Sequence, residues 1–402
     1  MLVSLPLNIT MQNYVRHQLS SAALKVTCVS TLTELKILAE SITELTDNLS
    51  SYNPFYEEWM LLPAFEFIIE NKVAIALVWS NDETKLIGVF PLEAKSKYHH
   101  CPIKYYSLWR HKHCFLGTPL VRLNHEQQCL SAFFTWLTEQ EFGRFLFQFE
   151  NIASDDRFMV HLKRVVLEHG LKCEVVEHHF RPVLNSDLEG AAYLAASTST
   201  KHLKDLRKKR QKLELLGSIE FQSFSPSENL SDWIDQFLQL ELRGWKGKNN
   251  TAMACHENER LFFHAIVQNA FNQNRLLFLK MNLNDQPIAM RCGFRCNEVA
   301  YSFKIAYEET LEKYSPGVLL ELEHLNRIQD QDDIQWVDSC AAPGPSSLSR
   351  LWTETREISS IVVSTDTVMG KCLVSTAAAL TRMTRLLRSR NLASRGEPYH
   401  PF

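Results

Sequence analysis

The sequence lacks the features that mark membrane-spanning, secreted and disulfide-stabilised proteins. No apolar run approaches the roughly 20 residues that a helix needs to cross a bilayer. Residues 1–7 lack the basic flank and the long apolar core of a secretory signal. The ten cysteines include no C-x-x-C pair and show no regular spacing, so we expect reduced thiols that mostly pack in the interior. Together these absences predict a cytoplasmic protein.

Strong charge of either sign is also missing. The net charge of −3 at pH 7 argues against a general nucleic-acid binder, so no stable nucleic-acid partner is expected. Apolar residues make up 45% of the chain and charged residues 22%, which is typical of a globular protein. A chain of 402 residues is long for a single core, and two domains are therefore expected.

Zinc-like spacing is absent as well. Two segments, His99-His-Cys101 and His111-Lys-His-Cys114, carry metal-capable side chains. Neither spacing matches a zinc pattern, and the residues between the two segments are aromatic. We therefore predict no metal site.

The clearest structural signals in the sequence lie in the C-terminal half. Alternating apolar residues there predict a meander of three strands, and Ser315 is a good N-cap for a helix that follows. A strand, a crossover helix and a second strand make a parallel pair, and ligands of such sheets bind at the carboxyl ends of the strands. The expected elements are strands at 276–281, 287–296 and 299–307, a helix from Pro316 to about residue 330, and a short buried strand at 334–338.

The joint between strand and helix, Ser315-Pro-Gly317, has the size and polarity of a phosphate site. The first turn of a helix has unpaired N–H groups and the positive end of the helix dipole, so it can bind an anion. Gly317 has no side chain to block close approach. The same residues are also typical of an ordinary helix start, so both interpretations stay open on the residues alone.

Several motifs in the same order resemble the GNAT acyltransferases, and among them the CelD-type branch, which is related to the Fem-type aminoacyl transferases. The resemblance covers most of residues 197–363. It implies an α/β fold, of α+β type with a mixed sheet, and acetyl-CoA or another acyl-CoA as co-substrate without a metal. The motifs are Y-x-F-K-I-A-Y at 301–307, S-P-G-V-L-L at 315–320, W-V-D-S-C at 336–340 and L-W-x-x-x-R at 351–356.

The N-terminal half has the same order of elements, which predicts two tandem GNAT-like units. In place of the phosphate joint it has Asn124-His125-Glu126, whose acidic side chain would repel a phosphate. We therefore expect only the second unit to bind coenzyme and the first to shape the acceptor cleft. The expected strands of the first unit include 65–70, 73–79, 86–93 and 114–121. The expected divisions are an extension at 1–24, units at 25–186 and 201–365, a linker at 187–200, and a basic amphipathic helix with a tail at 366–402.

The resemblance also implies where the coenzyme binds. The main chain around Ile305, Ala306 and Tyr307 is expected to pair with pantetheine as an added strand would. The split between this strand and the strand at 334–338 would admit the acyl chain. The residues implied for the pyrophosphate are Ser315, Pro316, Gly317 and Val318.

The candidates for catalysis are less specific. Lys304 lies between apolar neighbours in mid-strand, where it could neutralise an acceptor carboxylate or have a lowered pKa, or could form an ion pair with Asp338 or Glu308. Asp338 is a candidate base or a turn aspartate. Many GNAT enzymes protonate the leaving thiolate with a tyrosine from the helix after this strand, but residues 346–352 contain none. Tyr307, Tyr301 or water could replace it.

Three further segments bear on partners. The basic helix expected at 201–216 is a solvated face or a lip that attracts phosphates. Trp245, in a polar loop, could pack on a ligand or cap the core. The helix expected at 371–390 could touch a membrane surface or dock on its own domain.

The acceptor is expected to be a small-molecule or glycan-precursor amine, or a hydroxyl. The alternatives are a Fem-like transferase that uses aminoacyl-tRNA and a degenerate binding module in polysaccharide biosynthesis.

Overall fold

The computed structural model describes residues 24–98, 102–140, 145–188, 190–329, 333–344, 348–376 and 379. The extension predicted at 1–24 lies almost entirely outside the described residues. So do the segment His99-His-Cys101 and most of the helix predicted at 371–390. Within the described ranges, no helix combines the length and the apolar character that a membrane span requires.

The first half follows the order strand, helices, meander, helix, strand, helix, strand. Local signals start several of these elements: Thr31 and Glu34 form a reciprocal capping box for α2, and Asp156 caps α6. The elements are β1 (Lys25–Val29), α2 (Leu32–Ile37), α3 (Ala39–Thr46), α4 (Glu58–Phe67), β2 (Val73–Trp79), β3 (Leu86–Lys95), β4 (Tyr105–Leu108), β5 (Leu120–Val121), α5 (Glu126–Thr138), β6 (Leu146–Ala153), α6 (Arg157–Glu168) and β7 (Cys173–Leu184).

Two strand predictions in this half are wrong. None of the strand predicted at 65–70 forms, because residues 65–67 complete α4, which is apolar on nearly every side and therefore shows no clear period. Of the strand predicted at 114–121 only β5 forms. The aromatic segment that forms β4 was not predicted as a strand.

After α7 and α8, the second half repeats this order up to its last two strands, between which the described residues contain only the 3-10 turn Leu348–Arg350. The observed bounds of β11 are those predicted, and the other predicted elements of this half differ by a few residues. The elements are α7 (Gly190–Ser197), α8 (Thr200–Glu214), β8 (Ile219–Ser223), α9 (Leu230–Arg243), α10 (Trp245–Lys248), α11 (Glu257–Asn272), β9 (Leu276–Leu283), β10 (Gln286–Cys296), β11 (Val299–Tyr307), the 3-10 helix η3 (Glu309–Tyr314), α12 (Pro316–Gln329), β12 (Trp336–Asp338) and β13 (Glu354–Ser364).

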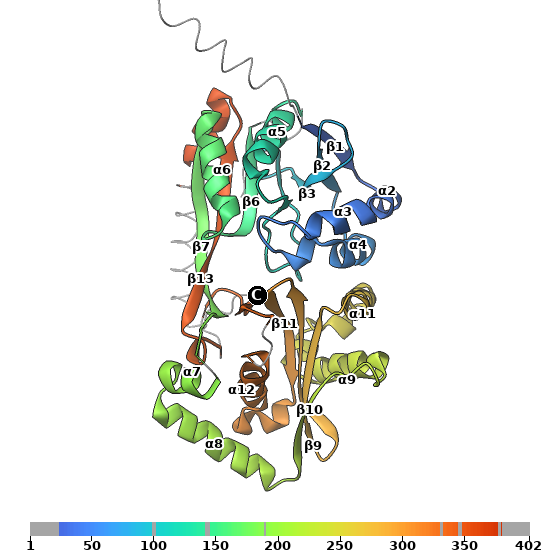
Figure 1. The fold of residues 1–402 in the computed structure, drawn as a ribbon, viewed down its shortest axis with the longest axis vertical. Helices are drawn as coiled ribbons and strands as arrows, with labels where there is room; N and C mark the ends of the chain where they lie inside the picture. Colours follow the sequence, from blue (N-terminus) through green and yellow to red (C-terminus); the bar gives the residue numbers. More distant parts are fainter. Residues whose placement is uncertain are drawn as a thin grey trace, which may run out of the picture.

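One mixed sheet joins the two halves (Figure 1). The strand order in the described chain is β1-β2-β3-β4-β6-β13-β7-β12-β11-β10-β9-β8, with β5 paired to β3. Each half contains one parallel pair, β4 with β6 and β11 with β12. The final strands are exchanged: β13 lies between β6 and β7, and β7 in turn pairs with β12. The divisions at 186 and 201 stay predictions, since each half completes the sheet of the other.

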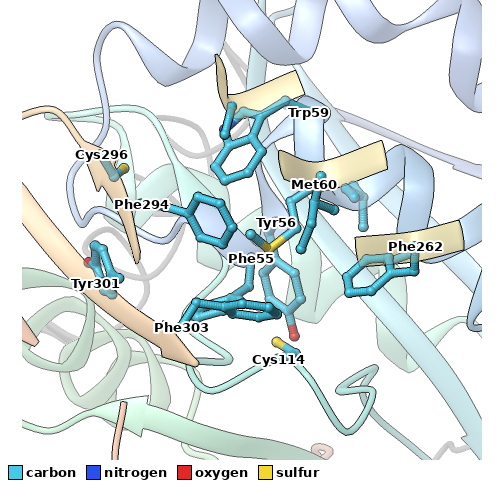
Figure 2. Close-up of a cluster of buried hydrophobic side chains, with 14 of the residues drawn as sticks. Phe55, Tyr56, Trp59, Met60, Cys114, Phe262, Phe294, Cys296, Tyr301 and Phe303 are labelled. Carbon is cyan, nitrogen blue, oxygen red and sulfur yellow. The ribbon is translucent and has the colours of Figure 1, made fainter. Parts of the chain in front are cut away.

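The halves also share a hydrophobic core (Figure 2). The rings of Trp59 and Phe294 lie 5.1 Å apart, and those of Phe55 and Tyr301 lie 6.1 Å apart. Each pair joins a residue of the first half to a strand of the second, and α4 packs against α11. The first half therefore buries one face of the second. The segment predicted as a linker at 187–200 contains α7, whose Tyr193 is buried.

Candidate functional site

The open edge of β11 is the first part of the site. β12 pairs with β11 only at Val299, Ala300 and Tyr301, because β12 ends at Asp338. β11 continues to Tyr307, and β10 pairs with it on the other side. The N–H of Glu308 donates to the C=O of Ile288 at 2.8 Å. Since bonding alternates along an antiparallel pair, the main-chain groups of Ile305 and Tyr307 point toward the open edge.

A β-bulge decides which way the side chains of β11 point. Cys292 pairs with Lys304 and Gly293 with Ser302, so Phe303 is the extra residue. Beyond the bulge, Lys304 lies on the α9 and α11 side of the sheet, where Glu241 and Glu259 act on its charge. Ile305 and Tyr307 face α12. A Cβ added at Gly317 would lie 3.2 Å from Tyr307 Cδ1 and 3.7 Å from Ile305 Cδ1.

The N-terminus of α12 is the second part of the site. Ser315 has a left-handed backbone (φ 55°, ψ 51°), and its C=O accepts a bond from the N–H of Leu319 at 3.0 Å. Pro316 has no N–H, so Gly317 and Val318 keep the main-chain donors that have no acceptor within the helix. Lys209 of α8 donates to Ser315 Oγ at 3.0 Å. Three positive or partly positive groups therefore meet at this turn.

The corresponding turn of the first half contains an acid instead. Glu126, the first residue of α5, is 1% exposed, and Arg157 donates to its Oε1 at 3.2 Å. Burial would raise the pKa of Glu126, but the N-terminal N–H groups, Ser50, His161 and Arg157 hold it below its ordinary value. A carboxylate thus fills the position that a phosphate would need.

Lys304 lies beside the open edge without a counter-ion. Burial lowers its pKa to about 8, against the attraction of Glu241 and Glu259. Neither Asp338 nor Glu308 pairs with it, so the predicted ion pairs do not form, and no other acid in the described ranges comes within ion-pair distance. Glu241 instead binds Lys246 at 2.8 Å, and Glu259 binds Lys112 and, at 2.8 Å, His113.

A small pocket opens between α9, α10 and the end of β11, lined in part by Glu241, Trp245, Lys246, Ile305 and Tyr307. Lys246 Nζ lies 3.4 Å from the C=O of Ile305. Trp245 is 52% exposed, so it does not cap the core. Tyr307 is half-buried, and burial raises the pKa of its hydroxyl. The pocket places a tyrosine and a lysine, Tyr307 and Lys246, at the edge of β11.

The structure argues against Asp338 as a base. Asp338 is fully buried, and its Oδ2 accepts from Arg181 at 2.5 Å and from Arg356 at 3.1 Å. Burial would raise its pKa, but these two guanidiniums and the N–H of Cys340 hold it below its ordinary value. A carboxylate so stabilised takes up a proton poorly. Because the three side chains come from β7, β12 and β13, this network joins the exchanged strands.

Sequence reasoning missed Arg181, Glu241 and Lys246. No feature of the sequence pointed to Arg181, because a single arginine in a strand looks the same whether it is buried in an ion pair or exposed to solvent. Lys246 stood in the polar loop at 244–250, which was noted only for Trp245. His113 stacks on Phe262 and binds Glu259. Among the residues that the structure describes, no three potential ligands gather to hold a metal ion.

Comparison with known proteins agrees with this geometry. Residues 200–344 match the family model described as an acetyltransferase (GNAT) domain. No curated protein matches the sequence. A conserved protein of unknown function from Bacteroides thetaiotaomicron is 14% identical with a TM-score of 0.53, over 85% of this chain and 100% of that one. FemX is 8% identical with a TM-score of 0.53, over 83% and 96%. A tandem GNAT protein from the clavulanic acid biosynthesis pathway is 10% identical with a TM-score of 0.42, over 86% and 99%.

The predicted α/β fold, with a mixed sheet and two GNAT-like units, is confirmed by the order of elements and by the folds of FemX and the Bacteroides thetaiotaomicron protein. Identities this low show the fold alone. The family match adds the activity class for the half that contains β11 and α12. Residues 200–344 therefore match an acetyltransferase (GNAT) domain, and this segment lies in a chain whose fold is similar to that of FemX.

Proposed function

We propose that the protein is an acyl-CoA-dependent N-acyltransferase that transfers an acyl group, most simply acetyl, directly to an amine. One observation carries the proposal: the open main-chain edge at Ile305 and Tyr307 ends beside the N–H groups of Gly317 and Val318, with Lys209 next to them. An extended thiol arm that ends in a pyrophosphate has that form. The family match at residues 200–344 supports the same ligand.

The binding roles follow from the direction of each group. Pantetheine would bond the N–H and C=O groups of Ile305 and Tyr307 along the open edge. Ala306 bonds β10 instead, and its small buried side chain leaves room beside the arm. The pyrophosphate would accept from the N–H groups of Gly317 and Val318, while Ser315 and Pro316 shape the turn. The left-handed backbone of Ser315 is a strained conformation of the kind that gathers at ligand sites.

The chemistry needs a neutral amine and a protonated leaving group. An acceptor ammonium would first give a proton to Lys304, whose pKa of about 8 keeps a useful fraction neutral near pH 7. The amine would then attack the thioester carbonyl, so that a C–N bond forms and the C–S bond breaks. The departing thiolate would take a proton from Tyr307 or from water, and the nitrogen of the new amide would release the proton that restores this donor. Lys304 as a cationic anchor for an acceptor carboxylate is the competing role.

The proposed acceptor is a small molecule or a glycan precursor with an amine, or a hydroxyl, and the proposed reaction takes place in the cytosol. A second candidate function is transfer from aminoacyl-tRNA, which the exposed basic face of α8 favours. A degenerate binding module remains the non-enzymatic alternative, because no tyrosine is present at 346–352. The open edge of β11 favours the enzyme.

Calorimetry with acetyl-CoA, free CoA and transfer RNA tests these candidates on the purified chain. Acetyl-CoA binding should be lost in Gly317→Val, because the added side chain would push against Tyr307. His125→Val makes a matched control at the equivalent turn of the first half and should leave binding unchanged. Unaltered affinity in Gly317→Val would refute this phosphate position. Binding of transfer RNA without acetyl-CoA would replace the proposal by the second candidate.

A further inference from the structure

A row of lysines runs along α8 beside the proposed pyrophosphate turn. At 3.6 residues per turn, positions 201, 204, 208 and 212 lie on one side of the helix. All four side chains are exposed. The row consists of Lys201, Lys204, Lys208 and Lys212.

The contacts of α8 show which way this row faces. Leu206 and Leu213 are buried and mark the side of α8 that packs on the protein. Arg210 reaches one flank, where its guanidinium lies 5.5 Å from the centre of the Phe221 ring. Lys209 reaches the other flank and binds Ser315. The lysine row faces away from Leu206 and Leu213, and Lys212, three residues along the helix from Lys209, is its member nearest the Lys209 flank. Figure 1 shows α8 at the end of the molecule next to α12.

Few acidic side chains neutralise the charge of the lysine row. Of the two acids on α8, Asp205 pairs with Lys209 at 3.3 Å and Glu214 pairs with Arg210. Within the described residues, none of the four lysines lies within 4.0 Å of an acid. Like charges three and four residues apart destabilise a helix, so a counter-ion at this flank would relieve a repulsion that the helix retains without one.

Resting on the proposed function, we propose that this row binds the 3′-phosphate of the adenosine end of CoA. A pyrophosphate at Gly317 and Val318 directs the pantetheine arm along β11 and leaves the adenosine end outside the turn, where α8 lies. The 3′-phosphate is a compact dianion at that end. Lysine ammonium groups on flexible stems suit such a target as point charges. The row would thus select CoA over dephospho-CoA.

The test compares the affinities of CoA and dephospho-CoA by calorimetry at low and high ionic strength. Wild-type protein should bind CoA about tenfold more tightly at low ionic strength, the worth of a single charge-assisted bond. The preference should shrink to about twofold in Lys208→Gln/Lys212→Gln and also at high salt. Arg207→Gln removes one charge from the next position on another face of α8 and should leave the preference intact.

The outcomes separate the two proposals. If the wild-type chain binds both molecules equally, the lysine row does not read the 3′-phosphate, although the proposed function stands. If it binds neither, both proposals fail. If the double variant keeps its preference for CoA but loses binding to transfer RNA, the row serves a polynucleotide, and the 3′-phosphate assignment is overturned.

Discussion

Replacing Lys304 with methionine should stabilise the protein and abolish its proposed activity. Methionine has nearly the volume of lysine and no charge to bury. The ordinary lysine pKa of 10.5 falls to about 8 at this position, which corresponds to about 3 kcal/mol spent on keeping the ammonium in its buried setting. That figure already includes the attraction of Glu241 and Glu259 and the repulsion of Lys246 and Lys112, and relaxation around the smaller charge-free side chain sets how much of it is recovered. The free energy of unfolding should therefore rise by about 1–3 kcal/mol at pH 7.

The gain in unfolding free energy of Lys304→Met should be large at low pH and should decrease as the pH rises. Lys304 loses its proton near pH 8 in the folded chain and near pH 10.5 in the unfolded chain. Below pH 8 both states are charged, so the cost of burial is present in full. Between these values the unfolded state binds more protons, and rising pH stabilises the wild type. The advantage of Lys304→Met should shrink through this window and vanish above it.

Urea unfolding of wild type and Lys304→Met at pH 7 and pH 9.5 measures this difference. Lys304→Arg is the matched control, because it keeps a charge that cannot be lost and should give no gain. A variant that is less stable than wild type at pH 7, or a gain that does not change with pH, would refute the reasoning.

Acyl transfer by the same variants separates the two roles of Lys304. If Lys304 is the base, both variants are inactive and the wild-type rate rises with pH through about 8. If it anchors an acceptor carboxylate, Lys304→Arg keeps activity and the wild-type KM rises above that pH instead.

Three further substitutions test the remaining assignments. Asp338→Asn leaves two buried arginines without their shared anion and should cost about 3 kcal/mol of unfolding free energy, measured in urea; a stable but inactive variant would return Asp338 to the base role. Tyr307→Phe should lower kcat up to about a hundredfold with little change in KM if the hydroxyl protonates the thiolate, and an unchanged kcat would assign that proton to water. Gly317→Val should raise the Kd for acetyl-CoA at least about tenfold in calorimetry while its urea midpoint stays near that of wild type, and a collapse of stability would mean that Gly317 serves packing rather than phosphate.

Much of the second half could be predicted from the sequence because its signals are local. Strand alternation from residue 276 to 307 and the Ser315-Pro-Gly317 helix start are decided by neighbours a few residues apart. The predicted bounds of β11 match the structure for that reason. α4 was misassigned in part because a segment that is buried on nearly every side shows no period.

These local signals could not predict which distant strands pair with one another. Nothing near Glu354 indicates that β13 inserts between β6 and β7, because strand pairing depends on which edges remain open after the rest of the sheet has formed. The structure assigns Asp338 to an ion-pair network rather than to a base, and this too depends on long-range pairing. Its partner Arg181 is 157 residues away in sequence, and only the exchange of β7 and β13 brings the two together.

The sequence by itself determined the strand and helix order from residue 276 to 338, the motifs that resemble the acyltransferase family, the helix start at Ser315-Pro-Gly317 and the position of Lys304 between apolar neighbours. Only the tertiary structure decided what Lys304 faces. A one-residue bulge at Phe303 shifts the pleat, so that Lys304 turns toward Glu241 and Glu259 while Ile305 and Tyr307 turn toward α12. A side chain in a strand alternates with a period of two, and a single inserted residue reverses every face beyond it.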